Sequence, residues 1–287
     1  MPRAKKSTPS STAKASTDAL QLVKNGDRAP ADVHVFGKDK RFVCDTEQRG
    51  HATPRGRSPL EIVVDVSEGF IPLWARDTVL RWRFRETSMK AFANPAAAKT
   101  VIRKLFGEAL LLWGDAAPVK FAERDDNWDF EIVMNKHGEC DANGCVLASA
   151  FFPDAGRHKL RLYPELFQQS QQEQVETLVH EIGHVFGLRH FFANVSEREW
   201  PSQIFGTHKP FSIMNYGSNS VLTADDKADL KSLYQLAWSG STPKINNTPV
   251  RLVRPYHEAG TSPSGLIAVS ELQPMAEPLP RAAYAGS

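Results

Sequence analysis

A helix that carries two histidines on one face is the strongest constraint in this chain of 287 residues. It begins at Ser170, and Glu173 three positions later completes the sequence of a capping box. Gly187 is placed to end the helix. Apolar residues recur between these positions at helical spacing and predict one buried face. They are Val175, Leu178, Val179, Ile182, Val185 and Phe186.

The last part of this helix, in the sequence HEIGHVFGLRH, has the spacing of a metal site. His180 and His184 are one turn apart, about 40° around the axis, so both imidazoles leave the same face. That separation suits two bonds of roughly 2.0–2.1 Å to one zinc ion. Glu181 lies about 100° further round, where it can reach a water on the metal. After the turn at Gly187, His190 can approach as a third ligand, which leaves a fourth position for water, as in catalytic zinc sites.

The rest of the chain predicts an α+β fold in which helices pack on a mixed sheet. Apolar and polar residues alternate in 78–85, as in a half-buried strand. Asn94 is placed to start another helix, which ends at Gly114. A third helix follows Thr223, with Asp226 as the acid of its capping box. Further strands are expected in 119–123, 128–134, 144–152 and 158–163.

The composition is that of a globular protein, with 41% hydrophobic and 24% charged residues. The formal net charge of +2 gives no indication of nucleic-acid or membrane-surface binding, and no apolar run is long enough to predict a membrane span. Residues 1–17 are basic and rich in Ser, Thr and Ala, without an apolar core. They predict a disordered arm and not a secretory signal, with a transit peptide or a basic localisation patch as alternatives.

The sequence HEIGHVFGLRH resembles the zinc signature of the metzincin metalloendopeptidases, and SIMNYG, which contains Met214, matches their Met-turn. Four more stretches resemble those of matrixin catalytic domains in the same order: ALLLWGDAAPVKFAER, FEIVM, GCVLASAFFPDAG and LTADDKADLKSLY. The resemblance implies one catalytic zinc ion held by His180, His184 and His190. It also implies that Glu181 is the general base and that Met214 forms an apolar floor beneath the histidines.

The matrixin likeness gives the expected fold in more detail. It implies a mixed, mostly parallel five-stranded twisted sheet with two long helices, a small, mainly irregular C-terminal subdomain with a third helix, and zinc in the cleft between them. Residues 249–256 are compatible with a short strand. We expect four regions along the chain. They are a disordered basic arm at 1–30, an N-terminal extension or prosegment at 31–74, the catalytic domain at 75–239 and a Pro/Ser-rich tail at 240–287.

The chain departs from the matrixins where they bind a second, structural zinc ion. His137 and Glu139 resemble the first two ligands of that ion. Ser149 and Arg161 occupy the positions of the next two histidines, and the acids that follow in the family are absent as well. These substitutions argue against a structural zinc ion and against calcium sites of the matrixin type.

Tyr216, two residues after Met214, resembles a tyrosine of the astacins and serralysins more than a feature of the matrixins. In those families the matching tyrosine is a removable zinc ligand that then stabilises the oxyanion. The likeness implies the same catalytic role for Tyr216, and the alternative is a packed tyrosine of which only the ring matters.

The three cysteines fall into two groups. Cys140 and Cys145 flank DANG, whose Asn-Gly pair favours a tight turn that could bring them together as a disulfide. The bridge would lie where matrixins hold structural zinc. Cys44 precedes the catalytic region, and the resemblance to matrixin zymogens suggests a latency switch in which its thiolate blocks zinc. Its surroundings, RFVCDTEQRG, do not reproduce the family motif, so an inert free cysteine is the alternative.

Together these features predict a zinc-dependent metalloendopeptidase that hydrolyses internal peptide bonds with a water activated by glutamate. An extended protein or peptide substrate would pair with an edge strand within Leu147–Ala150, although an ordinary edge without a ligand is the alternative. Residues 191–211 and 215–219 would shape the substrate pocket. Three other classes stay open: a catalytically impaired zinc-binding interaction module, a zinc exopeptidase, and a nucleic-acid-binding protein that uses the basic arm at 3–14. The matrixin likeness suggests a secreted or extracellular protein.

Overall fold

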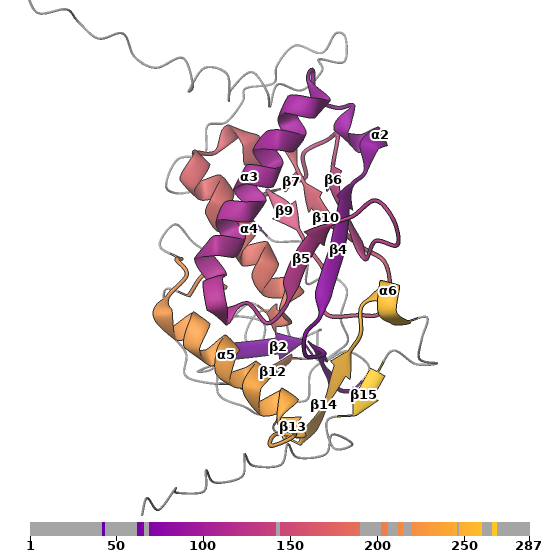
Figure 1. Ribbon diagram of the computed structural model, residues 1–287. Coiled ribbons are helices and arrows are strands. Elements are labelled where there is room, and N and C mark those ends of the chain that lie inside the picture. The colour runs from indigo at the N-terminus through magenta and orange to yellow at the C-terminus, as the bar shows by residue number, and fades with distance from the viewer. Residues whose placement is uncertain are drawn as a thin grey trace, which may run out of the picture.

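The computed structural model describes most of the chain between residues 69 and 259, with short segments on either side (Figure 1). The described ranges are 42–43, 62–65, 69–141, 144–189, 202–205, 212–214, 220–245, 247–259 and 266–268. No helix within these ranges has both the length and the apolar character needed to cross a membrane.

A five-stranded sheet forms the largest layer of the fold, in the order β5-β4-β6-β10-β9 (Figure 1). Its pairings are parallel except at one edge, where β9 runs antiparallel to β10. The expectation of a five-stranded sheet is confirmed, and its mostly parallel pairing agrees with the prediction. The strands are β4 (Val79–Phe84), β5 (Lys120–Glu123), β6 (Phe130–Met134), β9 (Ala148–Ser149) and β10 (His158–Leu162).

Two long helices, α3 (Pro95–Trp113) and α4 (Gln171–Val185), pack against each other and against this sheet (Figure 1). Both begin where the sequence predicts. Asn94 caps α3 with its side chain, and Ser170 and Glu173 make both hydrogen bonds of a capping box at α4. The apolar faces of the helices and of the sheet together form the hydrophobic core.

The third helix, α5 (Ala224–Trp238), starts at a complete capping box and lies below the large sheet in Figure 1. This part of the molecule is less irregular than predicted, because strands from both ends of the chain build two further sheets near α5. One sheet has the order β11-β2-β12, and in the other β14 pairs with β13, β15 and β3. These strands are β2 (Ile62–Asp65), β3 (Ile71–Trp74), β11 (Leu188–Arg189), β12 (Ser202–Phe205), β13 (Lys244–Ile245), β14 (Thr248–Val253) and β15 (Leu266–Ala268).

The strands on either side of the predicted catalytic region, 75–239, pair with each other. Strand β3 runs parallel to β14, with Ile71 opposite Val250 and Trp74 opposite Val253. Val250, Leu252 and Val253 are buried, so a segment expected in a loosely held tail contributes to the core. The sequence TPVRLV is compatible with a strand, but its partner lies near the other end of the chain. Local periodicity cannot identify such a distant partner.

Short elements complete the described chain. Strand β8 (Gly144–Val146) pairs antiparallel with β7 (Cys140–Asp141) and parallel with β1 (Phe42–Val43). The single strand predicted for 144–152 is thus divided into β8 and β9. The remaining elements are α2 (Glu86–Met89), the 3-10 helices η2 (Gly114–Ala116) and η3 (Pro164–Gln168), and α6 (Tyr256–Ala259).

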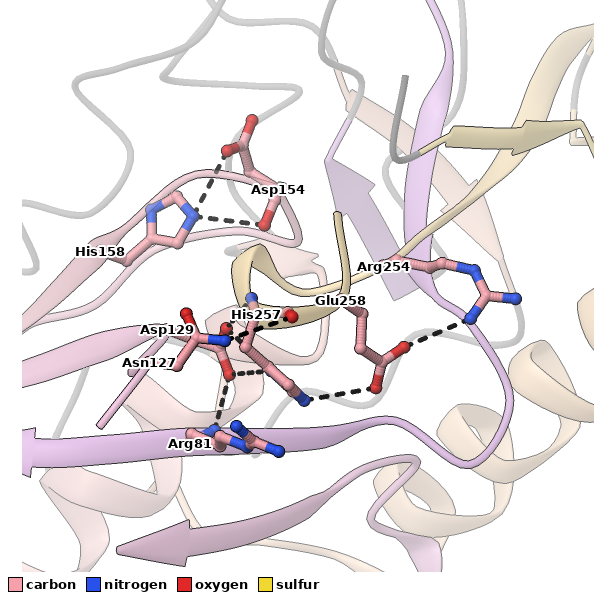
Figure 2. A network of polar contacts seen from close by, with 8 residues as sticks. All are labelled: Arg81, Asn127, Asp129, Asp154, His158, Arg254, His257 and Glu258. Carbon is pink, nitrogen blue, oxygen red and sulfur yellow. Dashed lines mark hydrogen bonds and ion pairs between the residues drawn. The ribbon is translucent and has the colours of Figure 1, made fainter. Parts of the chain in front are cut away.

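Helix α6 fastens the C-terminal segment to the large sheet through a buried carboxylate (Figure 2). Asp129, whose side chain is 2% exposed, accepts hydrogen bonds from the backbone N–H groups of Arg81 and His257 at 2.7 and 2.9 Å. Nδ1 of the His257 ring lies 2.9 Å from the same carboxylate. Asn127 adds a hydrogen bond from its side chain to the carbonyl of His257 at 3.4 Å. One carboxylate therefore connects β4, the start of β6 and α6.

We expect His257→Ala to lower the free energy of unfolding by about 1.5–3 kcal/mol, the range for a hydrogen bond to a charged group that is left buried. Urea denaturation measures this change. Glu258→Gln is the matched control, because Glu258 is 31% exposed and its contacts with His257 and Arg254 are 3.5 and 3.3 Å. That control should change stability by only about 0–1 kcal/mol. Equal stability of the two variants would contradict a fastening role for Asp129.

Candidate metal centre

The two histidines of α4 are oriented by backbone carbonyls. Nδ1 of His180 lies 2.7 Å from the carbonyl oxygen of Ile213, and Nδ1 of His184 lies 2.7 Å from that of Leu188. A carbonyl oxygen can only accept, so each Nδ1 is the protonated nitrogen. In the neutral ring this leaves Nε2 as the atom with a lone pair for a metal. The two rings are thus fixed both in direction and in tautomer.

The two Nε2 atoms converge on one point. They lie 3.2 Å apart, and the ring planes are nearly perpendicular at 86°. Two nitrogens each roughly 2.0–2.1 Å from one tetrahedral zinc ion would be about 3.3–3.4 Å apart. The separation in the structure therefore fits two ligands of a single zinc ion.

Glu181 completes a group of three side chains that could surround a cation. A carboxylate oxygen of Glu181 and one nitrogen of each histidine all lie within 4.8 Å of one another. Glu181 is 1% exposed and His184 is fully buried, while His180 is partly exposed. A carboxylate that is kept close to a metal position and away from bulk solvent is well placed to act on a water there.

Met214 lies directly against the helix that carries the histidines. A Cβ atom built on Gly183 would collide with Sδ of Met214, so the lack of a side chain at Gly183 permits this close approach. Met214 is itself 2% exposed. An apolar side chain therefore covers α4 at Gly183, the residue before His184. The role of Met214 as a Met-turn floor stays a prediction.

The segment that contains Met214 is held by the capping box of α5. The Ser212 hydroxyl donates to Asp226 at 2.6 Å and accepts the N–H of Met214 at 3.1 Å. The other carboxylate oxygen of Asp226 accepts both the N–H and the hydroxyl of Thr223 at 2.8 Å. One side chain therefore starts α5 and fixes the segment whose Ile213 carbonyl orients the first histidine.

Two large side chains bind the carbonyls at the end of α4. The Trp74 indole N–H donates to the carbonyl of Val185 at 2.6 Å, and the Tyr234 hydroxyl donates to that of Phe186 at 3.0 Å. Burial raises the pKa of Tyr234, so its hydroxyl stays a neutral donor. Gly187 then takes φ of +90°, the left-handed conformation that turns the chain back toward the site.

The sequence prediction found part of this centre. Of the predicted residues, the structure brings together His180, Glu181, His184 and Met214. His190, Tyr216 and Cys44 lie outside the described residues, as do residues 191–201, 206–211 and 215–219 of the predicted substrate pocket. The supporting contacts were missed, because they come from backbone carbonyls and from residues such as Ser212 and Trp74 that have no characteristic spacing. Gly183, inside a helix, was an available signal, since glycine there is unfavourable unless a neighbour approaches closely.

The region expected to replace a structural zinc site contains a disulfide. Cys140 and Cys145 are joined across β7 and β8, with Cα atoms 4.0 Å apart. His137 and Glu139 are exposed next to this hairpin, whereas Ser149 on β9 is buried. The hairpin of β7 and β8 is thus closed by a covalent bond, as the sequence predicts.

The sequence matches the family described as Matrixin over residues 73–235, which is more than half of the chain. The chain belongs to the matrixin family. Among curated relatives, it is 29% identical over 179 residues to Metalloendoproteinase 4-MMP of Arabidopsis thaliana, covering 57% of this chain and 48% of that protein. It is 28% identical over 166 residues to Stromelysin-3 of Xenopus laevis, covering 54% of this chain and 32% of that protein. The match thus spans less than half of either relative.

Among solved structures, the matrixin chain is similar to one titled "Structure of myroilysin". The TM-score is 0.39 with 16% sequence identity, over 60% of this chain and 98% of the other. Membership of the matrixin family implies a catalytic zinc ion, and the group of His180, Glu181 and His184 provides a place for it.

We expect Ser212→Ala to weaken zinc binding by about 10–100-fold, the usual effect of losing a residue that supports a metal ligand. The physical reason is that the segment carrying the Ile213 carbonyl loses the hydrogen bond from Ser212 to Asp226. Competition with a chelator of known affinity measures the change. Ser239→Ala is the control, because Ser239 is exposed and its hydroxyl bonds only at the far end of α5. Unchanged zinc affinity in Ser212→Ala would show that the anchor is unimportant.

Proposed function

We propose that this matrixin is a zinc-dependent metalloendopeptidase that hydrolyses internal peptide bonds of proteins or peptides. The observation that carries the proposal is the convergence of the His180 and His184 Nε2 atoms, 3.2 Å apart, beside the buried carboxylate of Glu181. His190 is proposed as the third ligand, since it follows the turn at Gly187 in the matrixin pattern.

Each residue of the centre then has one task. Zinc, when bound, lowers the pKa of water to about 7 and polarises a carbonyl. Glu181 takes a proton from the attacking water and returns it to the leaving amine. Tyr216, two residues after Met214, donates a hydrogen bond to the oxyanion that develops.

The substrate is proposed to bind in an extended form along β9. Within the described residues, β9 is one of the two outer strands of the large sheet, and it lies next to α4. Phe152, a few residues further along, meets the ring of His184 edge to face at 5.5 Å between centroids. An extended peptide paired to this edge would therefore pass close to the zinc position.

The alternatives are less well supported. A zinc-binding module that had lost catalysis would have no need of a carboxylate beside the metal, whereas Glu181 is present and 1% exposed. An exopeptidase needs a group that binds a chain terminus, and no observation favours one. The disulfide between Cys140 and Cys145 supports the proposal that the protein acts in an oxidising compartment, because disulfides persist there. This agrees with an extracellular location.

We expect purified protein to contain about one zinc ion per chain and to lose peptidase activity when a chelator removes it. Glu181→Gln should keep the metal while kcat falls by about 10²–10⁴, the usual contribution of general acid–base catalysis. Metal analysis together with cleavage of a peptide library measures both quantities. Glu86→Gln is the control, because Glu86 is 69% exposed and its carboxylate pairs with Lys99 of α3. Full activity of Glu181→Gln would rule out the mechanism.

Latency through Cys44 is proposed as part of the same function. Strand β1 pairs Phe42 with Cys145 and Val43 with Val146, directly before the proposed substrate edge. Cys44 is the next residue in the sequence. A segment that already pairs beside the substrate edge supports a nearby thiol as the blocking group, since a thiolate would fill the position that water needs.

We expect Cys44→Ser to hydrolyse a small peptide severalfold faster than the parent protein. A thiol-reactive mercurial should activate the parent but not the variant. The reagent reports on Cys44 alone, because the chain has three cysteines and the other two are joined in the structure. Equal activities and no response to the reagent would leave Cys44 as an inert cysteine.

A further inference from the structure

Strand β2 lies in the middle of the sheet next to the metal centre, although it comes from the N-terminal extension (Figure 1). It pairs antiparallel with β11, with Val64 opposite Leu188 and Val63 opposite Arg189. On its other side it pairs antiparallel with β12, where Gln203 lies opposite Val64. Strands β11 and β12 are not neighbours in this sheet, so β2 is the element that connects them.

Each residue of β11 is next to a proposed zinc ligand, Leu188 through a hydrogen bond and Arg189 in the sequence. The carbonyl of Leu188 lies 2.7 Å from Nδ1 of His184 and orients that ring. Arg189 immediately precedes His190, the proposed third ligand, and both β11 residues are 1% exposed. A strand of two residues has few backbone hydrogen bonds of its own, so its position depends on its neighbour in the sheet.

Strand β12 belongs to the segment proposed to shape the substrate pocket. The chain between β11 and β12 contains the third ligand and the first part of that segment. Because β2 pairs with both strands, it holds the two ends of this stretch at a fixed separation. Residues 62–65 also lie upstream of the part that matches the matrixin family, 73–235.

We propose that β2 is a permanent positioning element of the zinc site and not part of a removable prosegment. Its backbone hydrogen bonds hold Leu188 and the approach to His190, and they hold β12 across the same sheet. Any cleavage that activates the enzyme would therefore fall before β2, and after Cys44 if that cysteine blocks the zinc position. This inference rests on the proposed function, because it takes His190 to be the third zinc ligand.

The test uses the full-length chain with Val64→Pro and, as the matched control, Val64→Ala. β2 has partners on both sides, so the N–H of Val64 faces one of them and a proline removes that hydrogen bond. The alanine removes more of the side chain than the proline does but keeps the N–H, so it separates the loss of the hydrogen bond from the loss of the valine side chain. We expect zinc affinity to fall by about 10-fold or more in Val64→Pro, and by much less in Val64→Ala.

A synthetic peptide of residues 57–68 separates positioning from a general loss of structure. Added to Val64→Pro, it should restore zinc affinity in a saturable manner, because it can pair in place of the altered strand. The same peptide with the proline should have no effect. If Val64→Pro binds zinc as tightly as the parent, the proposal is wrong. A parent protein that binds no zinc would instead refute the proposed function.

If Val64→Pro does not fold, hydrogen exchange of the unaltered chain tests whether β2 positions the zinc site. We expect the amides of residues 62–65 to be protected, and their protection to rise together with that of Leu188 and Arg189 when zinc is added. Rapid exchange of 62–65 with and without zinc would overturn the proposal.

Discussion

The hydrogen bonds from two imidazoles to two backbone carbonyls govern the geometry of the metal centre. They fix which nitrogen of His180 and His184 is protonated and where the other one points. The helix alone puts both rings on one face, but it leaves each ring able to rotate. The 3.2 Å approach of the Nε2 atoms follows only when the carbonyls of Ile213 and Leu188 are in place.

The two carbonyls differ in the entropy lost when the chain brings each of them to its histidine. Leu188 is four residues from His184, so the turn after α4 brings it there with little loss of entropy. Ile213 is 33 residues from His180, and closing a loop of that length costs about 3 kcal/mol. One hydrogen bond contributes only about 1 kcal/mol and cannot hold such a loop. The bonds between Ser212 and Asp226, with the burial of the next residues, supply the rest.

The sequence predicted the features that depend on neighbouring residues. Capping boxes at α4 and α5, the Asn94 cap of α3 and the alternation in β4 all appear where the local pattern indicates. The histidine pair was predicted for the same reason, because helix geometry alone brings the two residues together. Pairing of Cys140 with Cys145 was expected from a tight turn, and the structure joins them.

What the sequence did not predict depends on segments that are far apart in the chain. The sequence of strand β2 does not indicate which sheet it joins. Its partners β11 and β12, of two and four residues, are too short to be recognised from their own sequences. The carbonyls that orient the histidines carry no sequence signal, since every residue has one. Resemblance to the matrixins supplied the Met-turn, but the family match begins at residue 73 and gives no information on strands before it.

The additions at both ends of the chain support the zinc helix through Trp74. Its indole N–H binds the carbonyl of Val185 at the end of α4, and its strand β3 is held in turn by β14 from the C-terminal segment. That segment is anchored further along by the contact of His257 with Asp129. A contact near the C-terminal end of the described chain is therefore connected, through two strands and one tryptophan, to the helix that carries the metal ligands. The contacts that support the zinc helix of this matrixin therefore extend beyond residues 73–235, the part that matches the family.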